Sequence, residues 1–284
     1  MRRTPESSIR RLAGLAAFTL IFTACGQAGA PPAEPRAPAA SGARTQIDSM
    51  QVIDLTHPLS PDSLYWPSGS PFEYERVSWG LNASGDWYAA GSFATAEHLG
   101  THLDAPIHFA PEVWSNAEIP AEHFIGAAAV IDISARAASD PDTTLTVADI
   151  EAWEAAYGAI PPGAIVIVRT AWSERWPDWN EYYGSDDPFD TTTMHFPGVS
   201  PEAATAIAER GASGVGIDTA SIDPGNDLDF RAHRILATAN LYNLENLTGL
   251  DQLPPAGATL LALPIKIAGG SGGPARVLAL LPPQ

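Results

Sequence analysis

Residues 98–108 read HLGTHLDAPIH, and this stretch holds three of the chain's seven histidines together with one aspartate. Ligands of one metal ion must lie close together, because each stands about 2.1 Å from the metal. On a flat strand, His98 and His102 would lie about 13 Å apart at roughly 3.3 Å per residue. One ion could not bind both, so metal binding requires the chain to turn between them.

Two residues inside this stretch restrict the path of its backbone. Gly100 and Pro106 disfavour a long helix but permit a turn followed by an extended piece. On such a path the first two histidines converge with Asp104, while His108 stands one short step away. The alternative is a polar loop whose histidines bind nothing, and a pattern of three histidines and one aspartate disfavours it. The stretch is therefore predicted to form part of a metal site.

Short apolar runs alternate with helical patterns over the rest of the chain, which predicts a mixed α/β fold in one domain. Helices are expected over 146–157, with Thr146 as N-cap, and over 200–210, with Ser200 as N-cap before a proline. The segment 172–196 is aromatic and polar without a period, and it is expected to be a long surface loop. The expected strands cover 127–133, 164–169, 214–218, 260–267 and 275–281.

The N-terminal part does not belong to this fold. A basic start and a short apolar run lead to small residues before Cys25, which predicts a signal peptide of the lipoprotein type over 1–24. An ordinary signal peptide with an incidental cysteine is the alternative. Residues 25–46 form an Ala/Pro-rich tether, and 47–284 form the folded domain. With Cys25 lipidated, the protein is expected to be exported and anchored to a bacterial membrane, facing the periplasm or the exterior.

The charge balance argues against a nucleic-acid partner. The chain has 15 basic and 33 acidic residues, a net charge of −18. Four arginines and one glutamate fall within 1–24, so the remainder has 11 basic and 32 acidic residues and a net charge of −21. Such a surface repels nucleic acid and anionic lipid headgroups. We expect no nucleic-acid binding, and membrane association only through the N-terminal lipid.

The histidine stretch resembles the signature of the metal-dependent "cyclase" hydrolases. That family includes bacterial kynurenine formamidase, isatin hydrolase and a metal-dependent dienelactone hydrolase. The resemblance extends over most of the chain after the tether, through the stretches 54–59, 65–67, 216–219, 221–225, 232–235, 244–247 and 269–276. It implies a β-rich domain of the swivelling β/β/α type with a few helices.

The resemblance also implies a site with two divalent metal ions, zinc or manganese. The matching positions are His98 and His102 for the first metal, His233 for the second, Asp104 and Glu245 as bridging carboxylates, His108 as catalytic acid/base, and Trp66 at the substrate. On one continuous helix His233 and Glu245 would lie about 18 Å apart. The chain must therefore turn between these two residues, and 240–243 is a reasonable place.

Together these features predict a hydrolase that cleaves an amide, cyclic amide or ester through metal-activated hydroxide. A bound metal lowers the pKa of water from 15.7 to about 7. His108 is expected to move the proton, since the unperturbed pKa of histidine is about 6.5. One alternative is a lipoprotein that binds metal or ligand without turnover, which has no need of His108. Another is a metal-dependent cyclase or dehydratase acting on a carbonyl substrate. The expected partners are a small-molecule substrate and, from the family, further copies in a homodimer or homotetramer.

Overall fold

The structure is a computed structural model that describes residues 49–283. The expected signal peptide over 1–24, the lipidation residue Cys25 and the tether over 25–46 lie outside the described residues. Within the described part, no helix is both long enough and apolar enough to cross a membrane.

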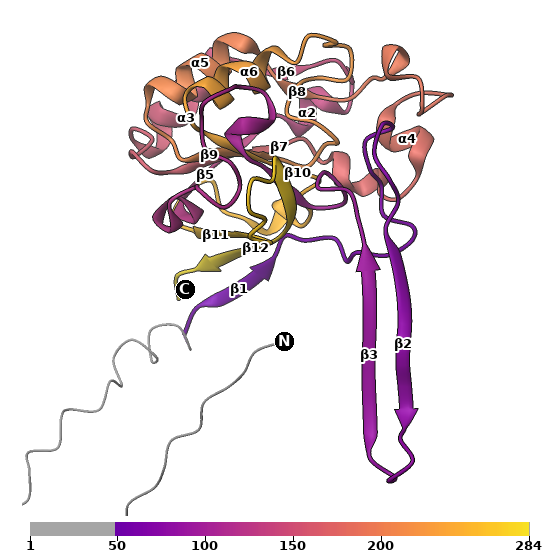
Figure 1. The fold of residues 1–284 in the computed structure, drawn as a ribbon. Helices are drawn as coiled ribbons and strands as arrows, with labels where there is room; N and C mark the ends of the chain where they lie inside the picture. The colour runs from indigo at the N-terminus through magenta and orange to yellow at the C-terminus, as the bar shows by residue number, and fades with distance from the viewer. Residues whose placement is uncertain (1–48, 284) are drawn as a thin grey trace, which may run out of the picture. The chain divides into compact units, whose positions relative to one another are not determined.

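A mixed sheet of eight strands forms the centre of the described chain (Figure 1). Its strands lie in the order β1-β12-β11-β5-β7-β9-β10-β4, and β4 also pairs with β12. This extra pairing closes seven of the strands into a barrel and leaves β1 outside the ring. The pairs β5–β7, β7–β9 and β9–β10 are parallel, and the others are antiparallel. The strands are β1 Gln51–Asp54, β4 His102–Asp104, β5 Ile125–Asp132, β7 Ile165–Arg169, β9 Gly214–Ile217, β10 Tyr242–Glu245, β11 Thr259–Pro264 and β12 Gly272–Leu281.

Helices lie over the parallel part of the sheet (Figure 1). The α-helices are α2 Ser134–Ala137, α3 Val147–Tyr157, α4 Trp179–Tyr183, α5 Pro201–Glu209 and α6 Arg231–Thr238. Short 3-10 helices cover Pro106–His108, Ala121–Phe124, Trp172–Arg175, Thr191–Thr193 and Leu250–Gln252. Two small sheets pair β2 Glu73–Leu81 with β3 Trp87–Ala94, and β6 Thr144–Leu145 with β8 Gly198–Val199.

The central strand β7 shows how the core is divided. Its side chains point alternately to opposite faces, as in any strand. Val166 and Val168 pack in the cluster under the helices, whereas Ile165 and Ile167 pack in the cluster inside the barrel. A strand buried on both faces reads as an unbroken apolar run, which is why the sequence signalled it clearly.

The predicted mixed α/β class is confirmed, and the helix starts are correct. Thr146 caps α3 in a reciprocal arrangement with Asp149, in which each side chain binds the other residue's backbone N–H. Ser200 caps α5, and its hydroxyl accepts a hydrogen bond from the N–H of Ala203. These polar side chains satisfy N–H groups that have no partner inside the helix.

The expectation of a surface loop over 172–196 is wrong. This segment folds through two 3-10 turns and α4 and buries a third apolar cluster. Its short turns give the aromatic residues no regular period, so the sequence pattern did not reveal their burial. The residues of this segment in that cluster are Trp172, Tyr182, Tyr183, Met194 and Phe196.

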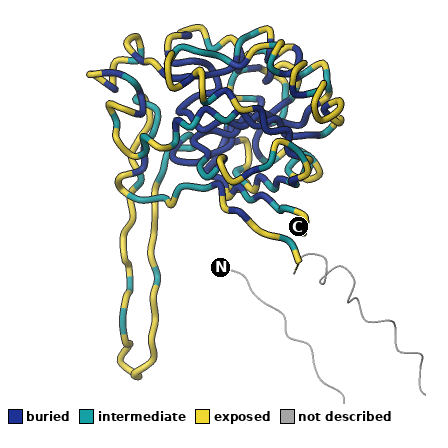
Figure 2. The backbone as a smooth tube through the Cα atoms, turned by 180° about the vertical axis from the view of Figure 1, so that it is seen from behind, coloured by how far each residue is buried: buried dark blue, intermediate teal, exposed yellow. Residues whose placement is uncertain are grey.

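Strands β2 and β3, residues 73–94, form a hairpin that was not predicted from the sequence, and we call it the arm. The arm projects from the barrel, and most of its length is exposed (Figures 1 and 2). A register shift between Arg76 and Ser78 interrupts the pairing of its strands. This bulge breaks the alternation of side chains by which a strand is recognised in a sequence.

Candidate metal centre and substrate pocket

Two adjacent strands bring three of the predicted ligands together. β4 and β10 pair antiparallel, and Glu245 lies directly opposite His102 in their register. Asp104 follows His102 by two residues, so both point to the same face of β4. All three side chains are buried. Pairing of two short strands therefore places an imidazole and two carboxylates at one point.

His98 joins this group through a sharp bend rather than a helical turn. Gly100 has a φ of +59°, in the left-handed region that glycine tolerates best. The bend brings the ring centroids of His98 and His102 to 5.4 Å. An extended piece, β4, follows at once. The predicted turn and extended piece are thus present.

His233 enters from the other side, on α6. The chain reverses at Asn240, whose φ is +59°, between the end of α6 and the start of β10. The Nε2 atom of His233 lies 3.0 Å from Asp104 Oδ2 and 3.1 Å from Glu245 Oε1. The predicted turn within 240–243 therefore allows both residues to share one site.

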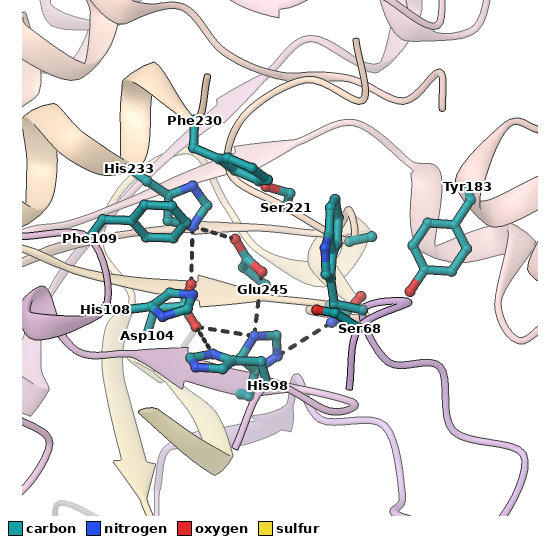
Figure 3. A pocket seen from close by; sticks show the side chains of 14 residues that line it. Ser68, His98, Asp104, His108, Phe109, Tyr183, Ser221, Phe230, His233 and Glu245 are labelled. Atoms are coloured by element: carbon teal, nitrogen blue, oxygen red, sulfur yellow. Dashed lines mark hydrogen bonds and ion pairs between the residues drawn. The ribbon is translucent and has the colours of Figure 1, made fainter. Parts of the chain in front are cut away.

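The two carboxylates lie at the centre of the cluster, with imidazoles around them (Figure 3). His98 Nδ1 is 2.6 Å from Asp104 Oδ1. His102 Nε2 is 3.2 Å from Asp104 Oδ1 and 3.4 Å from Glu245 Oε2, yet this buried atom makes no hydrogen bond within the described chain. Atoms of His102, Asp104 and Glu245 converge within 4.8 Å. A buried imidazole nitrogen without a hydrogen bond, beside two carboxylates, fits a divalent metal.

Electrostatics leads to the same interpretation. Burial lowers the pKa of His102, but Asp104 and Glu245 outweigh it and raise that pKa to about 10. Although burial opposes it, His98 and His102 hold the pKa of Asp104 well below its ordinary value. Two buried carboxylates need positive charge beside them, and either protons on the histidines or divalent cations can supply it. Binding of metal would therefore release protons.

Outer hydrogen bonds fix which nitrogen each histidine presents. His233 Nδ1 lies 2.6 Å from Asp223 Oδ2, and His102 Nδ1 lies 2.8 Å from the carbonyl oxygen of Gly100. Each Nδ1 can donate its proton to that oxygen, which leaves Nε2 free to face the cluster. Asp223 lies in the stretch 221–225 that resembles the family, but no role for it was predicted from the sequence.

His98 is held in the opposite orientation. Its Nε2 lies 3.0 Å from Ser271 Oγ, and that hydroxyl donates to Glu97 Oε2 at 2.5 Å. Because the Ser271 hydroxyl donates to Glu97, its oxygen accepts from His98 Nε2–H. His98 Nδ1 then faces Asp104, and either a second proton on the ring or a metal ion would satisfy both atoms. Sequence reasoning missed Glu97 and Ser271. The available signal was a lone serine within the glycine-rich stretch 269–273.

His108 differs from the other predicted site residues. It ends the 3-10 helix Pro106–His108 and is exposed, while its ring stacks on that of His98 at a centroid distance of 3.9 Å. Although the residue as a whole is exposed, its stacked ring is desolvated, and this lowers its pKa to about 4. The imidazole is therefore neutral at neutral pH. Atoms of His98, Asp104 and His108 also converge within 4.8 Å. The geometry thus allows His108 either to bind metal or to move a proton.

A cavity of about 250 Å³ opens onto the cluster. Trp66, Phe109, Tyr183 and Phe230 form its aromatic walls. Trp66 stands edge-on to Phe230 and Tyr183, at centroid distances of 5.8 and 6.4 Å. All predicted site residues in the described chain line this cavity, namely Trp66, His98, His102, Asp104, His108, His233 and Glu245. Their roles as ligands and catalyst stay predictions.

Comparison with known sequences gives related proteins over most of the chain. A family model described as "Putative cyclase" matches residues 53–224. Isatin hydrolase from Roseibium aggregatum is 33% identical over 256 residues, covering 85% of this chain and 95% of that protein. Kynurenine formamidase from Salinibacter ruber is 29% identical over 231 residues, covering 81% of this chain and 97% of that protein.

Solved structures show the same fold. Isatin hydrolase A from Ralstonia solanacearum superimposes with a TM-score of 0.77 at 38% identity, covering 88% of this chain and all of that one. An isatin hydrolase bound to the product analogue thioisatinate gives a TM-score of 0.78 at 33% identity, covering 86% of this chain and 98% of that one. The likeness therefore covers most of the described chain, including the barrel.

Proposed function

Because the chain belongs to the cyclase family, we propose that it is a metal-dependent hydrolase that opens the C–N bond of a cyclic or aryl amide. Its relatives include an isatin hydrolase and a kynurenine formamidase. One observation carries the proposal: two buried carboxylates ringed by three imidazoles form the floor of an aromatic pocket. Such a site can both hold a planar carbonyl compound and present it to metal.

We propose two divalent ions, zinc or manganese, since both metals bind imidazole and carboxylate ligands. When bound, divalent metal lowers the pKa of water and polarises a carbonyl oxygen. The residues that would hold it are His98, His102, Asp104, His233 and Glu245. Asp104 has an oxygen toward His98 and the other toward His233, which supports a bridging role. Glu245 likewise faces His102 with one oxygen and His233 with the other.

We propose that His108 transfers a proton from the attacking water to the leaving nitrogen. It is neutral at neutral pH, so it can accept a proton from the attacking water. The resulting imidazolium can give this proton to the leaving nitrogen, which otherwise departs as a poor leaving group. Its position at the exposed side of the cluster supports this role, because the other imidazoles are held by carboxylates or backbone.

The pocket walls are proposed to select flat, aromatic substrates. Phe109 packs on the ring of His233 at 4.3 Å and near Phe230 at 5.2 Å. Trp66 and Phe230 line the same cavity, edge to face at a centroid distance of 5.8 Å. These rings would bury an aromatic ring and exclude water from the carbonyl beside the metal.

Metal analysis followed by a substrate panel tests this proposal. The protein loaded with zinc or with manganese would be assayed on isatin, an N-formyl aryl amine, an aliphatic amide and a lactone. We expect up to two metal ions per chain and the fastest turnover on the cyclic or aryl amide. Bound metal with no turnover on any C–N substrate would contradict the proposal and favour a binding protein.

We further propose that the chain is an exported lipoprotein that acts as a homodimer or homotetramer. Support for export comes from the pattern of the N-terminal sequence, with Cys25 as the lipidated residue. A Cys25→Ser variant should leave the membrane fraction and lose incorporation of labelled palmitate. Incorporation by the variant equal to that of the native chain would contradict the anchor.

A further inference from the structure

A second cavity adjoins the cavity over the metal-binding cluster. It has a volume of about 230 Å³, and Trp66, Ser221 and Phe230 line both cavities. The rings of Trp66 and Phe230 stand edge to face at a centroid distance of 5.8 Å. Figure 3 shows Phe230 and Ser221 beside the cluster. These shared side chains form the boundary between the two cavities, and we call the second cavity the side pocket.

The side pocket is built by two stretches of chain, the segment 172–196 and the loop before α6. Apart from the three shared residues, its lining includes Thr191, Thr192, Phe196, Asp227 and Leu228. Phe196 is fully buried, whereas Leu228 is 54% exposed. The side pocket therefore extends from the buried aromatic cluster of this segment to the surface of the molecule. A substrate larger than the catalytic cavity could place its remaining part there.

Asp227 is the only charged residue of the described chain that lines the side pocket. Its side chain is 3% exposed. One oxygen accepts a hydrogen bond from the N–H of Asp229, and the other accepts from Arg231 Nε at 2.8 Å. The side chain of Arg231 is 60% exposed and does not line the pocket. Since each carboxylate oxygen can accept a second hydrogen bond, Asp227 can still bind a donor from the pocket.

The lining disfavours an anionic group and suits a cationic one. A carboxylate would lie near Asp227 without any basic residue of the described chain in the lining, and like charges repel strongly at a binding site. The net charge of −18 acts in the same direction. An ammonium group can instead donate to Asp227. It can also donate to Thr192, whose hydroxyl gives its own proton to Asp190 and keeps lone pairs free.

We propose that the side pocket binds a cationic substituent of the substrate, which is then a cyclic or aryl amide with a short chain that ends in an ammonium group. This inference rests on the proposed amide hydrolysis and specifies the class of amide. The flat amide occupies the cavity over the cluster, and its chain passes Trp66 and Phe230 to reach Asp227. Aromatic rings attract cations, so the path itself favours an ammonium group.

Asp227 also holds the loop that places Phe230. Its backbone N–H donates to the carbonyl oxygen of Pro224, and its side chain binds Asp229 and Arg231. Phe230 has a φ of +51°, a conformation that a bulky residue keeps only when its surroundings impose it. A disturbed loop would move Phe230 and lower the turnover of every substrate alike. The ratio between two substrates is therefore the measurement that reports on charge recognition.

Turnover of matched substrates tests the proposal. The metal-loaded protein would be assayed on isatins that carry a 2-aminoethyl, an ethyl or a 2-carboxyethyl group, placed at each position of the benzene ring in turn. At the most favourable position, kcat/KM of the aminoethyl compound should exceed that of the carboxyethyl compound by about 100-fold, since Asp227 attracts one chain and repels the other. The ethyl compound should lie between them.

Three variants separate charge from space. Asp227→Asn should lower the ratio of aminoethyl to carboxyethyl turnover by about 10-fold, because a hydrogen bond between charged groups is lost. Asp251→Asn is the matched control: it removes the same charge from an exposed residue that lines neither cavity, and the ratio should stay unchanged. Thr191→Trp should fill the side pocket and lower turnover of the aminoethyl compound relative to unsubstituted isatin.

Binding without turnover gives an independent readout. In calorimetry, 2-phenylethylamine is a cation of suitable size without an amide bond. Its Kd should rise by about 10-fold in Asp227→Asn. The uncharged 2-phenylethanol is the control ligand, and its Kd should change by a smaller factor. Binding of the amine as expected, with no isatin hydrolysed, would support the side pocket and contradict the proposed hydrolase.

Three outcomes would overturn the inference. The first is a native chain that prefers the ethyl or the carboxyethyl compound at every ring position, or that treats all three alike. The second is an Asp227→Asn variant with the native ratio of aminoethyl to carboxyethyl turnover. The third is a Thr191→Trp variant with the native ratio of aminoethyl compound to unsubstituted isatin, since the chain would then lie outside the side pocket.

Discussion

The metal centre and the arm differ in whether their side chains find contacts within the described chain. In the centre, buried polar groups lie against other groups of the same chain, from Asp223 behind His233 to Glu97 behind Ser271. On the arm, large apolar side chains are exposed instead, with Leu81 at 72% and Trp87 at 65%. The polar groups of the centre thus find their contacts within the described chain, whereas the arm leaves much of its apolar surface uncovered there. Substitutions in these two regions should accordingly affect different measurements.

The largest effect is expected from Asp104→Ala. Asp104 contacts three histidines of the cluster, so its loss should abolish both metal binding and turnover. Metal analysis by mass spectrometry and a turnover assay would measure this. Asp142→Ala is the control, because Asp142 also pairs with a histidine, His195, but lies away from the pocket. Full activity in the Asp104 variant would refute the assigned site.

His108→Ala should separate binding from catalysis. General acid–base catalysis contributes typically 10²- to 10⁴-fold, so kcat should fall by about this factor while the metal stays bound. Loss of metal together with turnover would assign His108 as a ligand instead, which its approach to His98 and Asp104 also permits. Steady-state kinetics and metal content on the same sample decide between these roles.

A smaller effect is expected behind the cluster, at Asp223→Asn. The carboxylate accepts from His233 Nδ1 and from the backbone of Ala232 and His233. An amide keeps one oxygen but loses the charge that orients the imidazole, so metal affinity should fall about 10- to 100-fold. Excess metal should restore most of kcat. If excess metal restores nothing, the residue acts on folding rather than on the metal site.

The smallest effect is expected on the pH dependence of stability, and it comes from Asp218, a buried carboxyl group outside the cluster. Burial raises the pKa of Asp218 to about 6, above its ordinary value near 4, even though Thr170 donates to it. The folded chain therefore binds this proton more tightly than the unfolded chain. The resulting stability is present below about pH 4 and is lost as the pH rises to about 6.

Asp218→Asn should remove this pH dependence. Between pH 4.5 and 7.5 the native chain should lose up to about 2 kcal/mol more stability than the variant, since one pKa unit corresponds to about 1.4 kcal/mol. Urea unfolding at both pH values measures the difference. Equal losses for the two proteins would show that Asp218 does not titrate in this range.

The centre was more predictable from sequence than the arm, and the reason is local geometry. Three predicted ligands and His108 lie within eleven residues, so a single bend could be argued from Gly100 and the spacing alone. His233 and Glu245 could be placed only by resemblance, because their approach depends on the pairing of β10 with β4. Asp223 and Ser271 were missed, since a hydrogen bond across the fold leaves no spacing in the sequence.

The arm and the segment 172–196 escaped prediction for a related reason. A bulge at Val77 shifts the alternation of side chains in β2, so the strand shows no regular period. In 172–196, burial arises from aromatic side chains on short turns, which give no helical or strand repeat either. Regular elements such as β7 and α5 were predicted because burial and period coincide there.

The short strand β4 has a consequence for the lifetime of the folded state. Three residues, His102–Asp104, pair with β10 on one side and β12 on the other, so they form the seam that closes the barrel. Two of these three residues are also predicted to bind metal. An ion held there would fasten the seam, and a chelator should open it, which hydrogen exchange at the amides of β4 would show. The rate at which activity is lost and the rate of unfolding would then both be limited by dissociation of the metal.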